Sequence, residues 1–250
     1  MERKAKMNIN ERHSVVGLPS EEYNITKNPR EIFLLRGNGC KWKKCRFCDY
    51  HLDFSLDEND NFKLNSKVLE YLTGKFSCIE IINSGSFSDL DEKTMALIKA
   101  KCIEKKIEQI HFECHWNDRN NIQQLKNDFK KIGVTVKIKI GVETFDKLFR
   151  ESYLIKGIDE SSPEIIAEYA DEVCLLQGIP GQTAESMLTD IKIGLKYFER
   201  VCINIMCENS KPIKPDFRVI KIFKDLIYPT YVKNPRVDIL FTNTDFGVGE

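Results

Sequence analysis

From Arg30 onward, short runs of apolar and β-branched residues alternate with longer polar or amphipathic segments. This alternation is typical of repeated βα units that build a parallel sheet. The apolar runs alternate only weakly, as expected for strands that are covered on both faces. The runs predict strands at residues 31–35, 78–82, 109–113, 135–142, 172–176 and 201–206, with a closing strand at 236–241.

The segments between the strands predict helices. Asp91 is a predicted N-cap, because its side chain can accept a backbone N–H and the acidic Glu92 follows in the first turn. The N-terminal residues 1–30 are predicted to be an extension, since Pro19 and Pro29 interrupt any period. The clearest predicted helices lie at residues 91–105, 120–132, 162–170 and 183–198.

The six βα-like units contain no linker rich in Pro, Gly or Ser, and 250 residues suit a single α/β domain. We therefore predict an α/β fold: a partial (β/α)6 TIM-like barrel over residues 31–250, with an extra C-terminal strand. In such folds ligands bind beyond the C-terminal ends of the strands. The residues that follow each strand are accordingly the candidates for function.

Composition and charge narrow the classes of function. The chain has 42% hydrophobic and 30% charged residues, and its 38 basic residues balance 38 acidic ones. Such a chain has no net field to attract nucleic acid or an anionic membrane. No apolar stretch approaches the roughly 20 residues of a membrane span, and residues 1–14 lack the apolar core of a signal peptide. We expect a cytoplasmic protein without a membrane partner.

Three of the nine cysteines form a C-x4-C-x2-C array directly after the first predicted strand. They are Cys40, Cys45 and Cys48. Reduced thiolates this close together are suited to an iron-sulfur cluster or zinc, and the interleaved Lys and Arg would lower their pKa. The array predicts a metal centre.

The array is compatible with three kinds of centre. A structural zinc site would need a fourth ligand, such as His51. A plant-type ferredoxin centre would use a distant cysteine, such as Cys78, although Cys78 opens a predicted strand and a small electron carrier does not need 250 residues. Alternatively, three cysteines could hold three of four irons and leave the fourth open to a small molecule.

This third arrangement resembles the radical S-adenosylmethionine superfamily. That family usually has C-x3-C-x2-C after the first strand of a partial barrel, with an aromatic residue before the third cysteine. Phe47 matches the aromatic residue, whereas the x4 spacing departs from the usual array. The resemblance implies a 4Fe-4S cluster that reductively cleaves S-adenosylmethionine to methionine and a 5′-deoxyadenosyl radical, which abstracts hydrogen from the substrate.

Turns after three other predicted strands strengthen the resemblance. The Asn83-Ser84-Gly85-Ser86-Phe87 segment is similar to the turn that holds the methionine amino group, although alone it would be an ordinary βα turn. Glu143, with Lys156-Gly157 downstream, is similar to the residue that accepts ribose hydroxyls. The Gly178-Ile179-Pro180-Gly181 segment is similar to the turn beside the adenine. The implied cofactor-binding residues are Phe47, Asn83, Ser84, Gly85, Ser86, Glu143, Gly178, Ile179 and Pro180.

Polar residues after the remaining strands are the candidates for substrate recognition. Glu113 and His115 lie at the end of the third strand, although they could equally be a capping carboxylate and a packed imidazole. Cys114 between them is expected to be buried. The other predicted substrate contacts are Asn204, Met206, Glu208, Asn209 and Asn243.

Within the superfamily, the Gly39-Cys40-Lys41-Trp42 opening and the Cys48-Asp49-Tyr50 exit resemble archaeosine synthase radical subunits and queuine lyases. Both families cut a C–N bond attached to the 7-methylene of a deazaguanine. A tRNA substrate would favour a basic surface, which this chain lacks, so we expect no direct tRNA binding.

The predicted activity is therefore lysis of free queuine to 7-aminomethyl-7-deazaguanine for salvage into tRNA, with Glu113, His115 and Glu208 as catalytic residues. The predicted partners are the deazaguanine and an electron donor such as flavodoxin or ferredoxin. The alternatives are an enzyme similar to 7-carboxy-7-deazaguanine synthase or archaeosine synthase, and a non-catalytic iron-sulfur electron-transfer protein.

Overall fold

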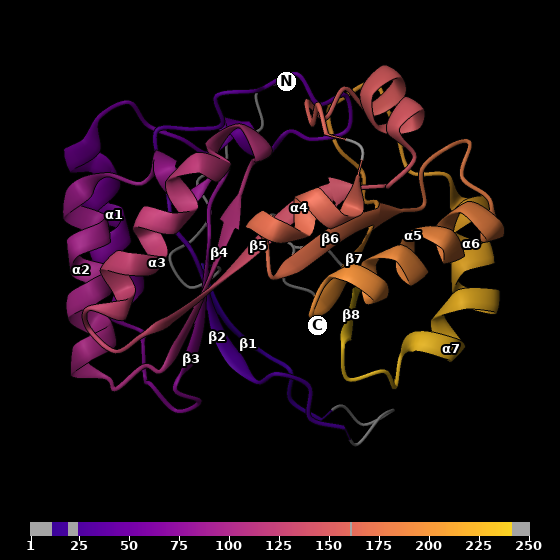
Figure 1. The fold of residues 1–250 in the computed structure, drawn as a ribbon. Helices are drawn as coiled ribbons and strands as arrows, with labels where there is room; N and C mark the ends of the chain where they lie inside the picture. The colour runs from indigo at the N-terminus through magenta and orange to yellow at the C-terminus, as the bar shows by residue number, and fades with distance from the viewer. Residues whose placement is uncertain (1–11, 20–24, 161, 242–250) are drawn as a thin grey trace. The chain divides into compact units, whose positions relative to one another are not determined.

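The computed structural model describes residues 12–19, 25–160 and 162–241 (Figure 1). Its contacts divide the chain into two compact units, which are described separately. The first comprises Met1–Gly17, Pro29–Lys41 and Tyr50–Lys137, and the second comprises Leu18–Asn28, Trp42–Asp49 and Ile138–Glu250. The prediction of one domain over residues 31–250 stays a prediction.

The strands confirm the predicted α/β class. They follow one another in the sheet in chain order, from β1 to β8. All strand pairings described are parallel except that of β1 with β2, so β2 to β7 are the six strands of the predicted partial (β/α)6 barrel and β8 is the extra strand. Each predicted strand lies within one or two residues of its observed bounds.

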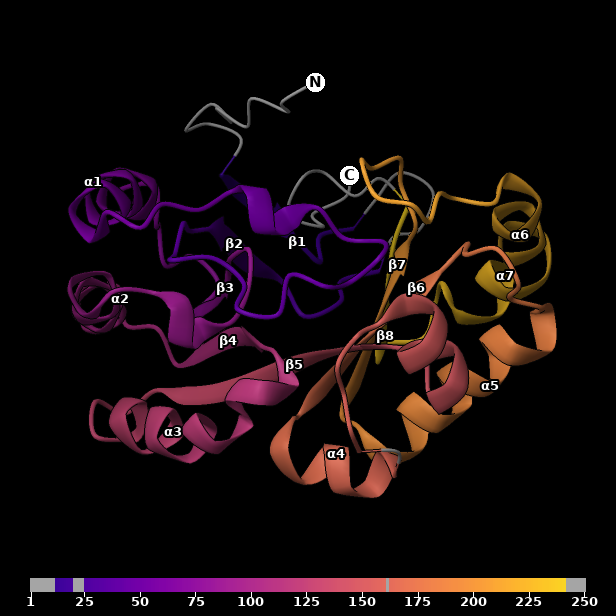
Figure 2. The same ribbon diagram turned by 90° about the horizontal axis from the view of Figure 1, so that it is seen from above.

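The first unit carries β1 to β4 with helices along one side of them (Figure 2). Its side chains pack into an aromatic core, in which Phe112 contacts Phe87 and Phe129 edge to face. Asp91 caps the second helix by accepting the N–H of Thr94, as predicted. The elements of this unit are β1 (His13–Val16), β2 (Arg30–Leu34), η2 (Tyr50–Leu52), α1 (Glu58–Leu69), β3 (Cys78–Ile82), η3 (Phe87–Asp89), α2 (Glu92–Glu104), β4 (Gln109–Cys114), η4 (Trp116–Asn121) and α3 (Ile122–Lys130).

Strand β1 and helix α1 of the first unit were not predicted. Strand β1 lies within the predicted extension and pairs antiparallel with β2. Helix α1 buries Asn61 and Asn65 at positions where a helix normally buries apolar residues. The Asn65 amide exchanges hydrogen bonds of 2.8 Å with the backbone of Arg36, so α1 holds the start of the cysteine loop.

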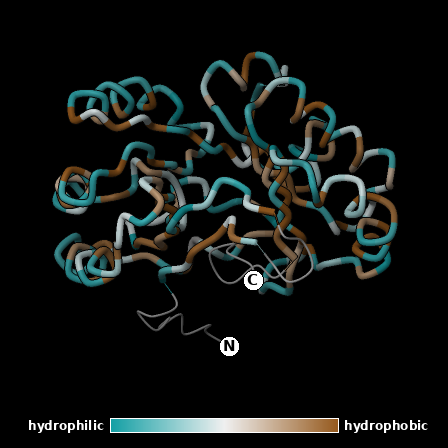
Figure 3. Tube along the Cα trace, turned by 90° about the horizontal axis from the view of Figure 1, so that it is seen from below, coloured by the Kyte–Doolittle hydropathy of each residue, from teal (hydrophilic) through white to brown (hydrophobic). Residues whose placement is uncertain are grey.

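The largest segment of the second unit starts within β5 (Thr135–Glu143) and carries the remaining strands. Helix α5 packs against β6 and β7, and Thr183 caps it by accepting the N–H of Ser186. In Figure 3 the strands are mostly hydrophobic, as expected for strands covered on both faces. The further elements of this unit are η5 (Phe149–Leu154), α4 (Pro163–Tyr169), β6 (Glu172–Gln177), α5 (Ala184–Tyr197), β7 (Arg200–Ile205), α6 (Phe217–Ile222), η6 (Phe223–Ile227), α7 (Tyr228–Tyr231) and β8 (Val237–Leu240).

None of the helices in the described part of the chain combines the length and the apolar composition that a membrane crossing requires.

Candidate functional site

In the first unit, Cys40 lies directly against the turn that follows β3. A Cβ added to Gly85 would lie 2.9 Å from the Cys40 Cα and 3.1 Å from the Cys40 nitrogen, both closer than ordinary contact. Only glycine leaves room for the two backbones to approach in this way. The structure thus brings together the first predicted cluster ligand and the predicted methionine-binding turn.

Asp89 organises this part of the site, although it was not among the predicted residues. Its buried carboxylate accepts the N–H of Ser86 at 2.8 Å, and its backbone carbonyl accepts the N–H of Asn38 in the cysteine loop at 2.8 Å. Burial raises the pKa of Asp89, while the Ser86 N–H and Lys41, 3.4 Å away, oppose that rise. The sequence signal is the capping box Ser86-x-x-Asp89.

The other predicted residues of the first unit lie around the same turn. Asn83 and Ser84 are buried, and each donates to a backbone carbonyl, that of Ser86 at 2.9 Å and that of Asp53 at 2.7 Å. The His115 N–H donates to the Ser86 hydroxyl at 3.4 Å, which places the end of β4 beside the turn. The imidazole of His115 also accepts the N–H of Asn117, as an N-cap would.

Glu113 is half-buried in β4. The adjacent Cys114 is buried, as predicted, and burial raises the pKa of its thiol to about 12. Such a thiol is neutral and unreactive at physiological pH.

In the second unit, the other half of the cysteine loop, residues 42–49, is fixed by two segments distant in sequence. The Trp42 indole N–H donates to the Ile155 carbonyl at 2.8 Å, and the Arg46 N–H donates to the Leu154 carbonyl at 3.0 Å. The buried carboxylate of Asp49 accepts the N–H of Ser210 at 3.0 Å. The segment that carries Cys45 and Cys48 is therefore held on both sides.

An apolar cluster lies beneath this segment. Phe47 packs against buried Ile179 and Met206, together with Leu154 and Ile213. The structure thus gathers one predicted aromatic residue of the cysteine loop, one residue of the predicted adenine turn and one predicted substrate contact.

Glu143 ends β5 at an irregularity of the strand. Its φ is 69°, a left-handed conformation that is uncommon outside glycine and that costs backbone energy. Its carboxylate accepts a hydrogen bond of 2.6 Å from the Lys156 ammonium. A Cβ on Gly141 would lie 2.9 Å from that carboxylate and 3.0 Å from the Lys156 nitrogen, so Gly141 leaves room for the pair.

The predicted adenine turn is a rigid loop. Gly178 has a φ of 92°, and a Cβ there would lie 2.6 Å from Ile220. The Gln182 side chain closes the turn, because it accepts the Ile179 N–H at 3.0 Å and donates to the Leu176 carbonyl at 2.9 Å. Pro180 lies within this closed loop and is half-buried.

The predicted substrate residues of the second unit lie on β7 and the loop after it. Asn204 is half-buried and Glu208 is exposed. The Asn209 side chain braces its own loop, donating to Cys207 and Ile213 and accepting from Lys211. Asn243 lies outside the described residues.

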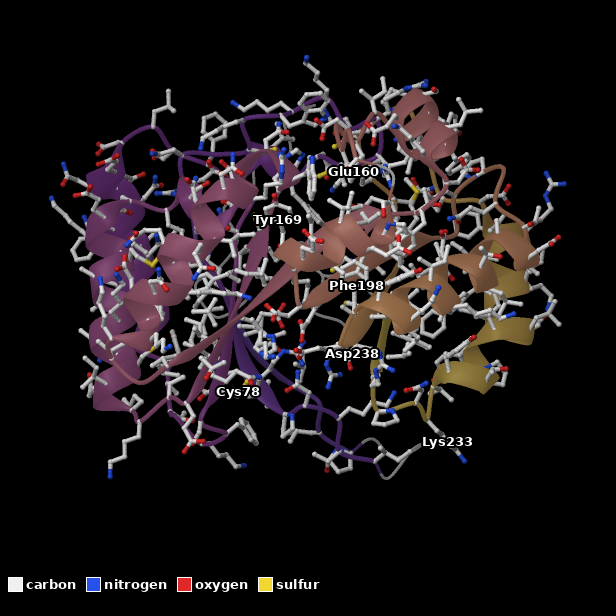
Figure 4. All side chains as sticks on the ribbon, in the orientation of Figure 1. Cys78, Glu160, Tyr169, Phe198, Lys233 and Asp238 are labelled. Carbon is white, nitrogen blue, oxygen red and sulfur yellow. The ribbon has the colours of Figure 1, made fainter. Side chains whose placement is uncertain are left out.

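Strand geometry separates Cys78 from the cysteine loop. Cys78 begins β3, at the lower end of this strand in Figure 4, whereas Cys40 contacts the turn beyond the other end. The five residues of β3 span about 13 Å at roughly 3.3 Å per residue. Cys78 therefore cannot share a cluster with Cys40, which argues against the ferredoxin alternative.

The three cysteines of the array, Cys40, Cys45 and Cys48, are half-buried thiols. Within the described residues, no group of three or more His, Cys, Asp or Glu side chains is arranged to hold one metal ion, and the side chain of His51 lies outside the described part.

Arg150, Glu151 and Lys156 make contacts close to Glu143 in sequence and were not predicted as site residues. Arg150 is fully buried and donates to the carbonyls of Thr144 and Glu160, the latter labelled in Figure 4. Glu151 accepts the N–H of Gly157 at 2.8 Å. No local sequence signal identifies the Arg150–Glu151 pair, whereas Lys156 stands in the Lys-Gly step noted above.

No protein-family model and no curated protein matches the sequence. Among solved structures, the chain is similar to Streptococcus suis SuiB bound to S-adenosylmethionine. The match has 12% identity and a TM-score of 0.48, and it covers 82% of this chain and 49% of that chain. That similarity is too weak to bear on fold or function. The chain is also similar to queuine lyase from Clostridium spiroforme bound to S-adenosylmethionine and queuine, with a TM-score of 0.86 and 39% identity over 96% of this chain and 99% of that chain. Identity at this level over the full length shows the family: the chain belongs to the queuine lyases of the radical S-adenosylmethionine superfamily.

Proposed function

We propose that this chain is a radical S-adenosylmethionine lyase that cleaves the C–N bond of free queuine and releases 7-aminomethyl-7-deazaguanine. The observation that carries the proposal is the 39% identity, over 96% of this chain, to a queuine lyase bound to S-adenosylmethionine and queuine. Both chains are covered almost completely, so the proposal does not depend on a shared fragment.

In this proposal, Cys40, Cys45 and Cys48 hold a 4Fe-4S cluster. The residues around these cysteines suit a cluster. Gly85 leaves room for the Cys40 backbone, and the contacts of Trp42, Arg46 and Asp49 fix the rest of the loop. When bound, the cluster supplies the electron that cleaves S-adenosylmethionine.

The residues proposed to bind S-adenosylmethionine present both polar and apolar groups. The turn at residues 83–86 offers backbone and hydroxyl groups for the methionine amino group, and Glu143 offers a carboxylate for the ribose hydroxyls. The rigid turn at residues 178–180 presents backbone groups to the adenine. Phe47 supplies the apolar packing that supports the loop.

Glu113, His115 and Glu208 are proposed to act on queuine. The guanine-like edge of the base has N–H donors, which carboxylates accept, and the diol hydroxyls suit Asn, Glu or His. Met206 and Asn204 lie at the end of β7, and Asn209 holds the loop that carries Glu208. Asn243 completes the proposed set.

We also propose that the protein acts in the cytoplasm, receives electrons from a small redox protein such as flavodoxin or ferredoxin, and does not bind tRNA directly. The balance of 38 basic and 38 acidic residues supports the last point, because RNA binding relies on a positive surface.

The test is mass spectrometry on anaerobically reconstituted protein incubated with dithionite, S-adenosylmethionine and queuine. Formation of 5′-deoxyadenosine together with 7-aminomethyl-7-deazaguanine supports the proposal. Deoxyadenosine without the amine keeps a radical enzyme but excludes queuine as substrate. If a protein with a fully loaded cluster forms neither product, the remaining interpretation is a non-catalytic electron-transfer protein.

A further inference from the structure

A buried ammonium group lies beside the half of the cysteine loop that carries Cys45 and Cys48. The Lys156 nitrogen is 2.6 Å from a carboxylate oxygen of Glu143 and 5.8 Å from the centre of the Phe47 ring. Phe47 immediately precedes Cys48. The Lys156 side chain is only 13% exposed, so water screens its charge weakly.

The backbone around Lys156 fixes where that charge stands. The Lys156 N–H donates to the Arg150 carbonyl at 3.2 Å. On either side of it, Ile155 accepts the Trp42 indole N–H, and Gly157 packs so closely on Trp42 that a Cβ would lie 2.4 Å from the indole. The cysteine loop and the Lys156 segment are thus locked to each other within the second unit.

The ammonium of Lys156 is held in place by the Glu143 carboxylate, 2.6 Å away. A weakly screened cation attracts negative charge nearby. It therefore stabilises additional negative charge on a group held by the neighbouring cysteine loop.

We propose that Lys156 is a positioning residue that raises the reduction potential of the cluster held by Cys45 and Cys48, and that Glu143 limits this increase. The inference rests on the proposed function, because it assumes the cluster. Reduction adds one negative charge to a cluster, and a nearby buried cation stabilises the reduced form. The partner carboxylate offsets part of that effect.

The experiment is a redox titration of the reconstituted protein, followed by electron paramagnetic resonance, without S-adenosylmethionine or queuine. For Lys156→Met we expect the ratio of reduced to oxidised cluster at a fixed potential to fall about tenfold, which is about 59 mV for a one-electron couple. Lys156→Arg keeps the charge and should retain most of the wild-type potential. The matched control is Lys44→Met, because Lys44 lies next to Cys45 but is exposed, and its effect should be less than threefold.

Glu143→Gln provides an independent test with the opposite sign. Removal of the carboxylate takes away one negative charge beside Lys156, so the potential should rise. If the Lys156→Met protein takes up no cluster, the Glu143→Gln variant alone tests the proposal. A reduction potential in Glu143→Gln that is unchanged or lower overturns it.

Two further outcomes would overturn the proposal. An unchanged potential in a fully loaded Lys156→Met protein removes the role of Lys156, and an equal fall in Lys44→Met shows that only net charge matters. Either result leaves the proposed function intact if the wild type still forms 7-aminomethyl-7-deazaguanine. If the wild-type protein takes up no cluster on reconstitution, both the proposed function and the proposed role of Lys156 are wrong.

Discussion

Replacement of Gly157 by alanine tests whether the contact with Trp42 builds the cysteine loop. Gly157 has a φ of 78°, and a Cβ there would lie 2.4 Å from the Trp42 indole. Trp42 would have to move by about 1 Å to restore ordinary contact at 3.4 Å. That movement would pull on the indole hydrogen bond to Ile155 and on the adjacent cluster ligands.

The structure offers a matched control in Gly133. Its φ is 77°, nearly the same as that of Gly157, but nothing lies within 4 Å of its added Cβ. Gly133→Ala therefore carries only the cost of the left-handed backbone, about 1–2 kcal/mol. Gly157→Ala carries the same cost plus overpacking of about 1–3 kcal/mol.

The measurement is the thermal midpoint of each cluster-free protein, together with iron and sulfide content after reconstitution. In a chain of this size 1 kcal/mol corresponds to about 2–4 °C, so an overpacking cost near 2 kcal/mol should make Gly157→Ala melt about 4–8 °C below Gly133→Ala. Only Gly157→Ala should load less iron. Equal melting and equal loading of the two variants would refute the reasoning, because the Trp42 contact would then carry no strain.

Three other predictions follow from the described contacts. Iron analysis of Cys78→Ser should find a full cluster, because Cys78 lies at the far end of β3, whereas serine variants of Cys40, Cys45 and Cys48 should lose the cluster. Loss of the cluster in Cys78→Ser would restore the ferredoxin alternative. Burial raises the pKa of Asp190 to about 6, above its unfolded value, so the native protein binds more protons and stability should fall as the pH rises through 6. This contribution is about 1 kcal/mol between pH 5 and pH 7, and Asp190→Asn should abolish it in urea unfolding; an identical pH dependence in the variant would show that another group is responsible. Glu113→Ala and Glu208→Ala should each lower turnover of queuine by about tenfold or more, and normal turnover in both would disprove the proposed substrate site.

The strand pattern was predictable because it depends on local chemistry. A strand covered on both faces, such as β3 or β6, must be apolar at nearly every position, so it stands out without knowledge of its neighbours. A capping residue such as Asp91 likewise acts on a backbone group three positions away. The three cysteines of the array lie within nine residues, so the array was also visible in the sequence.

Elements that use polar residues for burial were not predictable. Helix α1 buries Asn61 and Asn65, and these side chains stabilise the fold only through their hydrogen bonds to the loop after β2. Strand β1 has only four residues, and its pairing with β2 stabilises a segment with little pattern of its own. Such elements exist because of partners that are distant in sequence.

The sequence by itself determined the α/β class, the order of the strands along the chain and the array of three cysteines, because each follows from periodicity or from residues close in sequence. Only the tertiary structure decided that Lys156 pairs with Glu143 beside Cys45 and Cys48. That pair needs the left-handed backbone at Glu143, the space beside Gly141 and the buried Arg150 that holds the following loop. These conditions combine packing and electrostatics among several segments, and no single stretch of the chain contains them.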